Sequence, residues 1–540
     1  MAIPPGKCYS SISLAEMLKP LDQSFRDGEN NKVRLDVAYR IAESGLSNTI
    51  SDIYRKHGRE TCLLPLSAVS AAGSVYQQQT IGEKPIIGVL VGTTPTPIIR
   101  NHNAPSLESI SLDEIVIDRE NMEVCAGAAI TIDQLNQALA DTLSPAYRVP
   151  GADLTSYAYA QVGSTFMTGG MGPQRRYFSD SVSEVLLHNG NQLGTINQEQ
   201  LDHYAGTYGW TGMVGAVRCR YCRLPENEIA FALPIRNDSL EISRLLDHLT
   251  RFCFFEFSQD STTNLIGEQD VIIGLEHITS GSMEPLIQSS PDNVDAKRAR
   301  KLSEKCEQTH ADGVLFINAC TNHPIDDFLN LLIDGSDGES MSIGGIDLES
   351  AEIFRTAHEM RELREAIPYA ARMREPHGKY RHKNHTDANI RLNPEQTAVC
   401  TEALWNINQR YVNEIEQFIE ETDGLRGDII VYGHMNPYGL DPHNRLTIAA
   451  DNINTIYAAK ESVNQLRGDF YRGLGDMCEQ TASEMIGGEK GAVSEYEIIH
   501  ALGGPDSTPA SLRNKYQKQA DAVSSAAHNF NWRALDLYRG

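Results

Sequence analysis

Three stretches in the second half of the chain carry side chains that can bind an anion, ligate a metal or move a proton. The stretch VYGHMNPYGLDPHN contains His434 and His443, and the stretch IGGEKG contains Glu489 and Lys490 directly after two glycines. A guanidinium can clamp a carboxylate through two parallel hydrogen bonds. The third stretch, MRELREAIPYAARMREPHGKYRHK, concentrates such positive charge and contains Arg361, Arg364, Arg372, Arg374, Lys379 and Lys383.

The same residue types leave several interpretations open. Histidine and carboxylate ligands can hold a divalent metal that polarises a hydroxyl, and a histidine can also act as a base. Lys490 can act as a base only if burial or nearby charge lowers its pKa by several units from about 10.4; otherwise it is a cation that holds an anion. His434 could be a hydrogen-bonded residue at a strand end, and His443 could be a loop residue. The arginines could form a solvated helix face, paired with glutamates at helical spacing.

Glycine and hydroxyl residues gather in three segments of the first half. The segments are VLVGTTPTP, VPGADLTSYAYAQVGSTFMTGG and YGWTGMVGAVRC, and each adjoins a run that is typical of a strand. Glycine lets a backbone approach a ligand closely, and backbone N–H and hydroxyl groups at a strand end can bind an anion. The segments could line one long groove or be three unrelated turns, and composition alone does not decide between these.

The overall composition argues against several classes of protein. The chain has 540 residues, 41% of them hydrophobic and 22% charged, so it can bury a sizeable core and form more than one domain. The formal net charge of −25 argues against nucleic acid or an anionic membrane as the main partner. The N-terminal stretch lacks the apolar run of a signal peptide, and no run of about 18 apolar residues predicts a membrane-spanning helix. We expect a cytoplasmic protein.

The ten cysteines are scattered, and only Cys219 and Cys222 form a CxxC pair. The residues around this pair alternate as they do in a strand, and no second CxxC completes a zinc or cluster site. We therefore interpret the pair as two reduced structural cysteines rather than a metal or redox site, which suits a reducing cytoplasm.

Short strands alternate with single helices along the chain. We expect a helix within 31–60, a buried strand over 86–91, two short strands before a helix capped by Thr131, and a later helix that ends near Pro368. From about residue 455 the chain is mostly helical. This pattern predicts an α+β fold in which a second domain, 226–450, is inserted as an antiparallel sheet with helices on one face.

The order of the glycine segments resembles the FAD-binding domain of the vanillyl-alcohol oxidase/p-cresol methylhydroxylase (PCMH-type) superfamily. The resemblance covers about residues 60–225 and rests on the order of four motifs. Their C-terminal parts read, in chain order, GVLVGTTPTP, ITIDQLNQAL, VGSTFMTGGMGPQRRYFSDSVSEVLL and TGMVGAVRCRYCRLP. The resemblance implies FAD, which we expect to be non-covalent because His102, the only nearby histidine, lies outside the motif. The residues that it implies for FAD binding are Gly92, Thr93, Thr94, Thr96, Pro150, Asp153, Thr155, Ser156, Gly163, Ser164, Gly169, Gly170, Gly212, Val214 and Val217.

The later half resembles the D-2-hydroxyacid dehydrogenase branch of this superfamily, which includes the flavoprotein component of glycolate oxidase, D-lactate dehydrogenases and D-2-hydroxyglutarate dehydrogenase. LREAIPYA matches a helix whose arginine, here Arg364, binds the substrate carboxylate. Lys379 or Lys383 fits a later lysine that contacts the substrate.

The resemblance also implies a metal site. GHMNPYGLDPHN and GGEKG resemble the metal-binding segments of the branch, which implies that His434, His443 and Glu489 ligate a divalent metal such as zinc. Lys490 stands where the branch carries the histidine that is its usual candidate base.

We therefore predict an N-terminal helical extension over 1–58, a PCMH-type FAD-binding domain over 59–225, an α+β cap domain over 226–450 that binds the substrate, and a helical segment over 451–540 that closes the active site. The predicted function is FAD-dependent oxidation of a small D-2-hydroxy acid such as D-lactate, glycolate or D-2-hydroxyglutarate, with an electron acceptor protein or a quinone as partner and a homodimer as a possible assembly. Two alternatives stay open: a metal-independent FAD oxidoreductase that acts on another alcohol, aldehyde or sugar, and a non-catalytic FAD-binding component of a larger complex.

Overall fold

The structure is a computed structural model of the whole chain. It describes residues 35–40, 50–51, 54–56, 62–65, 86–90, 96–154, 160–174, 177–189, 192–207, 209, 211–236, 238–249, 253–254, 270–289, 291–332, 342–343, 346–347, 350–373, 376–436, 439–488 and 498–526.

The N-terminal half contains two main sheets within the described residues. Its strands are β1 (Leu35–Arg40), β2 (Cys62–Pro65), β3 (Ile86–Leu90), β4 (Ile98–Asn101), β5 (Glu114–Asp118), β6 (Glu123–Gly127), β7 (Tyr147–Arg148), β8 (Val182–His188), β9 (Leu193–Asn197), β10 (Met213–Arg220) and β11 (Cys222–Arg223). A parallel three-stranded sheet has the order β1–β3–β2, and a six-stranded sheet has the order β4–β5–β6–β10–β8–β9. β7 and β11 form a separate two-stranded ribbon.

Two helices pack against the six-stranded sheet, and their ends explain where they start and stop. α4 (Ile132–Thr142) begins at Thr131, whose side chain accepts a hydrogen bond from the Gln134 N–H while the Gln134 side chain accepts one from the Thr131 N–H. Such a cap stabilises a helix by about 1 kcal/mol. α5 (Val162–Thr168) ends at Gly169, whose φ of 67° is a left-handed conformation that glycine adopts without strain. The predicted cap at Thr131 is confirmed.

A ten-stranded sheet forms the second half. Its strands are β12 (Asn227–Ile235), β13 (Cys253–Phe254), β14 (Val271–Thr279), β15 (Gly313–Thr321), β18 (Glu352–Ile353), β19 (Tyr380–Asp387), β20 (Asn389–Arg391), β21 (Arg426–Asn436), β22 (Gly439–Ala450) and β23 (Glu484–Gly487). The order is β18–β12–β15–β14–β21–β22–β20–β23, with β13 beside β14 and β19 beside β22. β23 lies after residue 450, where the sequence analysis placed the end of the cap domain, and it nevertheless belongs to this sheet. β16 (Ser342–Ile343) and β17 (Ile346–Asp347) form a small ribbon of their own.

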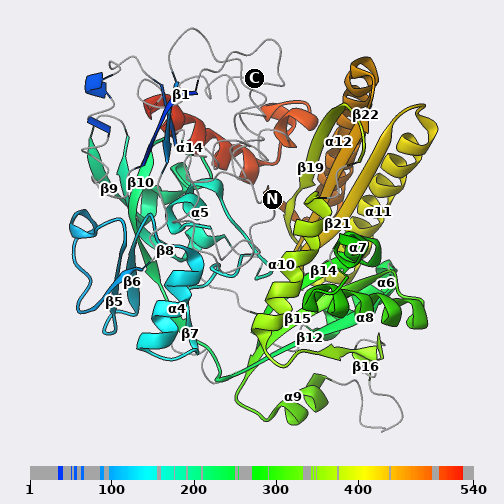
Figure 1. The fold of residues 1–540 in the computed structure, drawn as a ribbon, viewed down its shortest axis with the longest axis horizontal. Helices are drawn as coiled ribbons and strands as arrows, with labels where there is room; N and C mark the ends of the chain where they lie inside the picture. Colours follow the sequence, from blue (N-terminus) through cyan, green and yellow to red (C-terminus); the bar gives the residue numbers. More distant parts are fainter. Residues whose placement is uncertain are drawn as a thin grey trace.

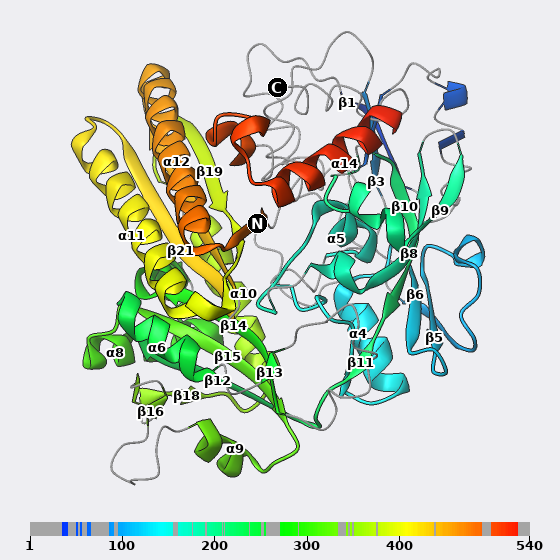
Figure 2. The ribbon, with the colours of Figure 1, turned by 180° about the vertical axis from the view of Figure 1, so that it is seen from behind.

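Helices cover both faces of this sheet, whereas the sequence analysis predicted helices on one face (Figures 1 and 2). α6 (Ser239–Leu249), α11 (Thr397–Glu421) and α12 (Ile453–Thr481) share one core with the first face. α7 (Glu284–Ser289), α8 (Val294–Thr309) and α10 (Ala357–Met373) share another core with the second face. The central strands β14 and β15 are buried along nearly their whole length because both of their faces are covered.

Two local predictions were wrong. Leu35–Arg40 is a strand paired with β3, not part of a helix, because a short apolar run fits either structure and strand pairing decides between them. α10 does not end near Pro368 but continues to Met373. Pro368 removes the N–H that would bond to the carbonyl of Arg364, yet the buried side chains of Leu363 and Ile367 hold the helix against the sheet.

The C-terminal helix α14 (Ala510–Ala526) contacts both halves of the molecule (Figures 1 and 2). The side chain of Gln519 donates a hydrogen bond to the carbonyl of Ala205, and Ser511 donates one to the carbonyl of Met485 in β23. The hydroxyl of Tyr177 donates a hydrogen bond to the carbonyl of Gly488, just after β23. The C-terminal segment thus spans the boundary between the two domains. The helix α9 (Ile325–Leu332) lies at the far edge of the second half.

Candidate functional site

The structure describes most of the segments predicted to bind FAD and brings them together around α5. The ideal Cβ position of Gly163 lies 2.9 Å from the Cβ of Ala128 and 3.4 Å from that of Val214 in β10, so a larger residue would push α5 off the sheet. Val217 follows on β10, opposite Ala126 of β6. The carbonyl of Pro150 accepts a hydrogen bond from Ser181.

The structure describes only some of the remaining residues that were predicted to bind FAD. Gly92, Thr93, Thr94, Thr155 and Ser156 lie outside the described residues. Thr96 is exposed on the loop before β4. Ser164 is buried and donates a hydrogen bond to the carbonyl of Gln161. A Cβ at Gly170 would lie 2.8 Å from the side chain of Thr165, and a Cβ at Gly212 would lie 2.7 Å from the carbonyl of His188.

One observation in this region fits a bound group. The hydroxyl oxygen of Thr165, in α5 directly after Ser164, is buried and has no hydrogen-bond partner among the described residues. A buried polar atom without a partner costs about 1–3 kcal/mol, so a ligand atom that reached it would relieve that cost. The described part of the region therefore fits a polar cofactor beside α5.

The glycine-rich segment continues into the boundary with the cap domain. The carbonyl of Pro173 accepts a hydrogen bond from the N–H of Leu275 in β14 at 3.2 Å. The Sδ of Met171 accepts one from Asn389 in β20. The side chain of Gln174 in turn accepts a hydrogen bond from the N–H of Gly151. The loop predicted to line the FAD site thus rests on the strand that carries Glu276.

Arg364 lies at this boundary and is fully enclosed. Its side chain is 2% exposed. Its Nε lies 2.9 Å from Oε2 of Glu276 in β14, and its Nη2 lies 3.5 Å from Oδ1 of Asp153 in the N-terminal domain. Asp153 was predicted to contact FAD; in the structure one of its oxygens faces a cap arginine. Despite the short distance to Glu276, Nε of Arg364 makes no hydrogen bond of good geometry among the described residues.

The two predicted histidines lie in the strands of one hairpin, next to Arg364. His434 in β21 is directly opposite Glu276 in β14 and Asp441 in β22, so the three side chains share one face of the sheet. Nε2 of His434 lies 3.7 Å from Glu276, and Nδ1 lies 3.7 Å from Asp441. Nε2 of His443, two residues along β22, lies 3.0 Å from Asp441. The interpretation of His443 as a loop residue was wrong.

We call this set the Glu276 cluster; its members are Asp153, Arg364, Glu276, His434, Asp441 and His443. Positive and negative groups alternate along it from the FAD-binding domain into the cap sheet. Burial alone would lower the pKa of His434, but the carboxylates of Asp441 and Glu276 outweigh it and raise that pKa to about 10. Burial would raise the pKa of Asp441, and the two histidines instead lower it. The cluster therefore holds several charges away from water.

Three members of the cluster form a donor set that could hold a metal. One ligand atom each from His434, Asp441 and His443 all lie within 4.8 Å of one another, and all three residues are buried. Two imidazoles and a carboxylate are ligands that zinc accepts. Glu489, the third ligand that the resemblance implied, lies outside the described residues, as does Lys490. The donor set fits a divalent metal, with Asp441 as a ligand that the sequence analysis did not name.

An aromatic and histidine group extends the cluster toward solvent. The ring of Tyr432 stacks on His443 with centroids 4.8 Å apart, and its hydroxyl lies 3.4 Å from Nε2 of His385 in β19. Nδ1 of His385 lies 3.4 Å from Asp387. His385 is 16% exposed, whereas His443 is fully buried, so this group forms the outer end of the polar chain.

The two predicted substrate lysines lie farther along the same segment. Lys379 is exposed just before β19, and its Nζ lies 5.1 Å from the ring centroid of Tyr380. Lys383 is exposed within β19, on the same face as His385 because residues two apart in a strand share a face. Neither is among the residues of the Glu276 cluster.

A second ionic group, which we call the Glu228 cluster, crosses the same domain boundary; its members are Arg148, Glu228, Arg361 and Asn318. Glu228 in β12 accepts hydrogen bonds from Arg148 of the N-terminal domain, from Asn318 in β15 at 2.9 Å, and from Arg361 in α10 at 3.2 Å. Burial would raise the pKa of Glu228, but Arg148 and Arg361 outweigh it and lower that pKa to about 2. Arg361 thus links the two domains. It does not lie on a solvated helix face, which was the alternative interpretation of the arginines in this segment.

The sequence analysis missed Glu276 and Asp441, although one signal was available for the first. Glu276 is the one acidic residue in VIIGLEHIT, an otherwise apolar strand, and a buried carboxylate needs a cationic partner. Asp441 gave no such signal, because its position opposite His434 depends on the hairpin register.

The CxxC pair is not part of either cluster. Cys219 and Cys222 are both buried, on β10 and β11. Burial raises the pKa of Cys219 well above its ordinary value, which keeps the thiol protonated and unreactive. This agrees with the prediction of reduced structural cysteines.

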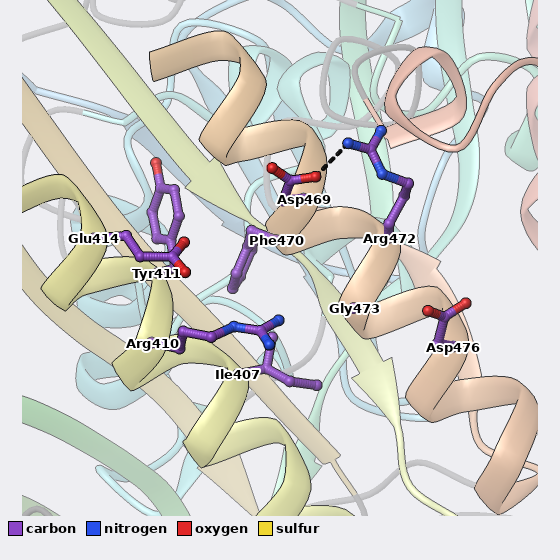
Figure 3. A pocket seen from close by; sticks show the side chains of 9 residues that line it. All are labelled: Ile407, Arg410, Tyr411, Glu414, Asp469, Phe470, Arg472, Gly473 and Asp476. Carbon is purple, nitrogen blue, oxygen red and sulfur yellow. Dashed lines mark hydrogen bonds and ion pairs between the residues drawn. The ribbon is translucent and has the colours of Figure 1, made fainter. Parts of the chain in front are cut away.

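An open pocket of about 420 Å³ lies on the other side of the cap sheet, between α11 and α12 (Figure 3). Its lining residues are Ile407, Arg410, Tyr411, Glu414, Asp469, Phe470, Arg472, Gly473 and Asp476. Arg472 pairs with Asp469 across one turn of α12, which leaves a lining of mixed charge. This pocket shares no residue with the Glu276 cluster.

Comparison with known proteins gives the fold. No protein-family model and no curated protein matches the sequence. Among solved structures, alkyldihydroxyacetonephosphate synthase is similar with 11% identity and a TM-score of 0.51, over 83% of this chain and 71% of that one. A berberine bridge enzyme variant described as a reticuline dehydrogenase has 12% identity and a TM-score of 0.48, over 96% and 93%. 6-Hydroxy-D-nicotine oxidase from Arthrobacter nicotinovorans has 11% identity and a TM-score of 0.43, over 92% and 93%.

The first similarity confirms the predicted α+β fold, here with a second domain built on a ten-stranded sheet. At such low identity it speaks for the fold and leaves substrate and chemistry to the site residues. In the described part of the chain, no helix combines the length and the apolar character needed to cross a bilayer.

Proposed function

We propose that the protein is an FAD-dependent oxidoreductase that oxidises a small D-2-hydroxy acid at the boundary between its two domains. One observation carries this proposal. Arg364, His434 and His443 are up to 79 residues apart in the sequence, and a carboxylate anchor and hydroxyl-directed histidines must lie together if they are to act on one substrate. They converge in the Glu276 cluster, beside the loop at Pro173.

The chain's own groups have distinct roles in this proposal. Arg364 binds the substrate carboxylate through the N–H groups that Glu276 and Asp153 do not engage, since a guanidinium has five donors and can hold a carboxylate in a fork. His434 and His443 orient the hydroxyl-bearing carbon. The burial of the whole cluster excludes water, which strengthens each of these electrostatic contacts.

FAD, when bound, would accept the hydride that leaves the substrate carbon, and this hydride carries both electrons of the oxidation. The residues that would hold it are those around α5 and β10, with Thr165 as an added contact, together with the predicted segments outside the described residues. Of the two candidate lysines, Lys383 remains the proposed substrate contact because it shares a strand face with His385, and Lys490 remains the alternative base.

The proposal also includes a divalent metal bound by His434, Asp441 and His443. The close approach of the three donors supports it. A metal at this point would polarise the substrate hydroxyl and favour loss of its proton. The alternative, a metal-independent oxidoreductase for another alcohol, aldehyde or sugar, draws support from His434, because two flanking carboxylates can hold its imidazolium without any metal.

The test is the absorption spectrum of the FAD-loaded protein under anaerobic conditions, recorded after addition of D-lactate, glycolate or D-2-hydroxyglutarate, with L-lactate as the matched control. We expect one D-2-hydroxy acid to bleach the flavin band and L-lactate to leave it unchanged. Bleaching by a simple alcohol or sugar but by no hydroxy acid would replace the proposal with the alternative substrate class. Protein that retains no flavin would contradict both and leave the non-catalytic role in a larger complex. Metal analysis of the same preparation decides whether one divalent ion accompanies each chain.

A further inference from the structure

Glu276 occupies a special position because it contacts both groups that the proposed reaction needs. Its Oε2 lies 2.9 Å from Nε of Arg364, and its Oε1 lies 3.7 Å from Nε2 of His434. It is fully buried on β14, and neither oxygen has a hydrogen bond of good geometry among the described residues. One carboxylate thus faces an arginine with one oxygen and a histidine with the other.

The backbone around Glu276 is held on both sides. β14 pairs with β15 and β21, and Leu275 donates its N–H to the carbonyl of Pro173 in the FAD-binding domain. A Cβ at Gly274 would approach the Cβ of Pro173 to 3.1 Å, so the two segments are in close contact. Glu276 therefore sits on a rigid strand at the place where the predicted FAD loop meets the cap.

We propose that Glu276 is a positioning residue that fixes the spacing between Arg364 and His434 and thereby selects 2-hydroxy acids over 3-hydroxy acids. This inference rests on the proposed function. In a 2-hydroxy acid the hydroxyl-bearing carbon is bonded directly to the carboxyl carbon, so the groups that hold the carboxylate and the hydroxyl must stay close together. In a 3-hydroxy acid one more carbon separates them. A shared carboxylate between the two protein groups holds them at the shorter spacing.

The Glu228 cluster provides a matched control. Glu228 is also a buried carboxylate that joins the cap to the FAD-binding domain, and it also binds an arginine of α10, Arg361. Within the described residues its hydrogen bonds are with Arg148, Asn318 and Arg361, and none of these belongs to the Glu276 cluster. Glu276→Gln and Glu228→Gln remove the same charge with the same change in shape, so they separate positioning from general stabilisation.

The experiment measures binding and turnover in the FAD-loaded wild type and both variants. Binding of oxalate, whose oxygens have the 2-hydroxy acid spacing, is compared with binding of malonate, which is one carbon longer, by isothermal titration calorimetry. We expect Glu276→Gln to weaken oxalate binding about tenfold and to lower kcat/KM for the 2-hydroxy acid about 100-fold, as displacement by about 1 Å can do. Malonate binding should change less than twofold. Glu228→Gln should keep the oxalate-to-malonate ratio of the wild type.

An unchanged oxalate-to-malonate ratio in Glu276→Gln would overturn the inference, as would a wild type that binds the two diacids equally. If Glu276→Gln does not accumulate as folded protein, Glu276→Asp decides in the same assay, because it keeps the charge but shortens the reach; a wild-type ratio there also overturns it. Failure of the proposed function looks different: no hydroxy acid reduces the flavin of the wild type, whatever the diacid ratios are.

Discussion

Two buried ionic clusters join the N-terminal domain to the domain of the ten-stranded sheet, and they differ in how completely their charges are satisfied. In the Glu228 cluster, one carboxylate accepts hydrogen bonds from two arginines and an asparagine. In the Glu276 cluster, His434 lies 3.7 Å from both of its carboxylates, whereas His443 lies 3.0 Å from Asp441. Both oxygens of Glu276 and of Asp441 lack well-formed hydrogen bonds among the described residues. Similar residue types thus form a closed structural contact in one place and an incompletely satisfied one in the other.

The difference suggests which cluster is built for chemistry. A buried polar group that lacks a good partner costs stability, so native proteins keep such groups mainly where a ligand or a reaction uses them. In the Glu228 cluster both carboxylate oxygens accept hydrogen bonds, and among the described residues the Oδ1 of Asn318 is its one buried side-chain atom without a partner. The Glu276 cluster retains donors on Arg364 and a donor set for a cation on the histidines, which is what a substrate and a metal would need.

Arg364→Lys should give the largest effect. The variant keeps one positive charge beside Glu276 and Asp153 but loses the planar fork that a carboxylate needs. We expect flavin reduction by the hydroxy acid to slow by at least about 100-fold, with a much smaller loss of stability than removal of the charge would cause. Anaerobic stopped-flow absorbance measures the first effect and urea unfolding the second. A variant that reduces its flavin at the wild-type rate would show that Arg364 does not hold the substrate.

Glu228→Gln should lower the stability of the protein but leave the rate of flavin reduction nearly unchanged. Breaking a buried ion pair leaves uncompensated charge on Arg148 and Arg361 and costs about 3–5 kcal/mol. We expect a clear shift of the urea midpoint, while the rate of flavin reduction per folded molecule stays within about twofold of the wild type. Loss of activity without loss of stability would mean that the two clusters cannot be separated as proposed.

The pH dependence of the free energy of unfolding should reveal the contribution of the Glu228 cluster. The pKa of Glu228 is lowered from 4.5 to about 2 in the folded protein, so its contribution to stability is complete above about pH 4.5 and is lost as the pH falls from there toward 2. We expect the stability of the wild type to fall over this window more steeply than that of Glu228→Gln. Parallel stability curves for the two proteins between about pH 5 and about pH 3 would contradict this assignment.

Lys379→Ala should have the smallest effect. The side chain is exposed and lies outside both clusters, near the ring of Tyr380. We expect stability to change by less than about 0.5 kcal/mol and kcat/KM by less than about twofold. Lys383→Ala serves as its comparison, because Lys383 lies on the strand face that also carries His385. A large loss of kcat/KM in Lys379→Ala would move the substrate site toward the start of β19.

The sequence predicted the parts of the fold that depend on local chemistry and on motif order. The cap at Thr131 and the strands β5 and β6 followed from residue types and spacing. The helix expected over Leu35–Arg40 failed because strand pairing with β3 is a long-range contact. The end expected at Pro368 failed because packing of α10 outweighed the loss of one hydrogen bond.

The site could be predicted only as separate residues. Arg364, His434 and His443 were found from their sequence surroundings, but Glu276 and Asp441, which join them, depend on the registers of β14 with β21 and of β21 with β22. A shift of either register by one residue would turn these side chains to the opposite face of the sheet. The sequence contains no local mark of such a register, so the network between the predicted residues became visible only in the structure.

The most direct test of the account compares the anaerobic rate of flavin reduction in Arg364→Lys and Glu228→Gln, side by side with the wild type and with the hydroxy acid that bleaches it best. The account predicts that Arg364→Lys loses at least about 100-fold in rate while Glu228→Gln reduces its flavin at nearly the wild-type rate, despite being the less stable of the two. The reverse order, with a fast Arg364→Lys and a slow Glu228→Gln, would place the chemistry away from the Glu276 cluster and contradict the central claim.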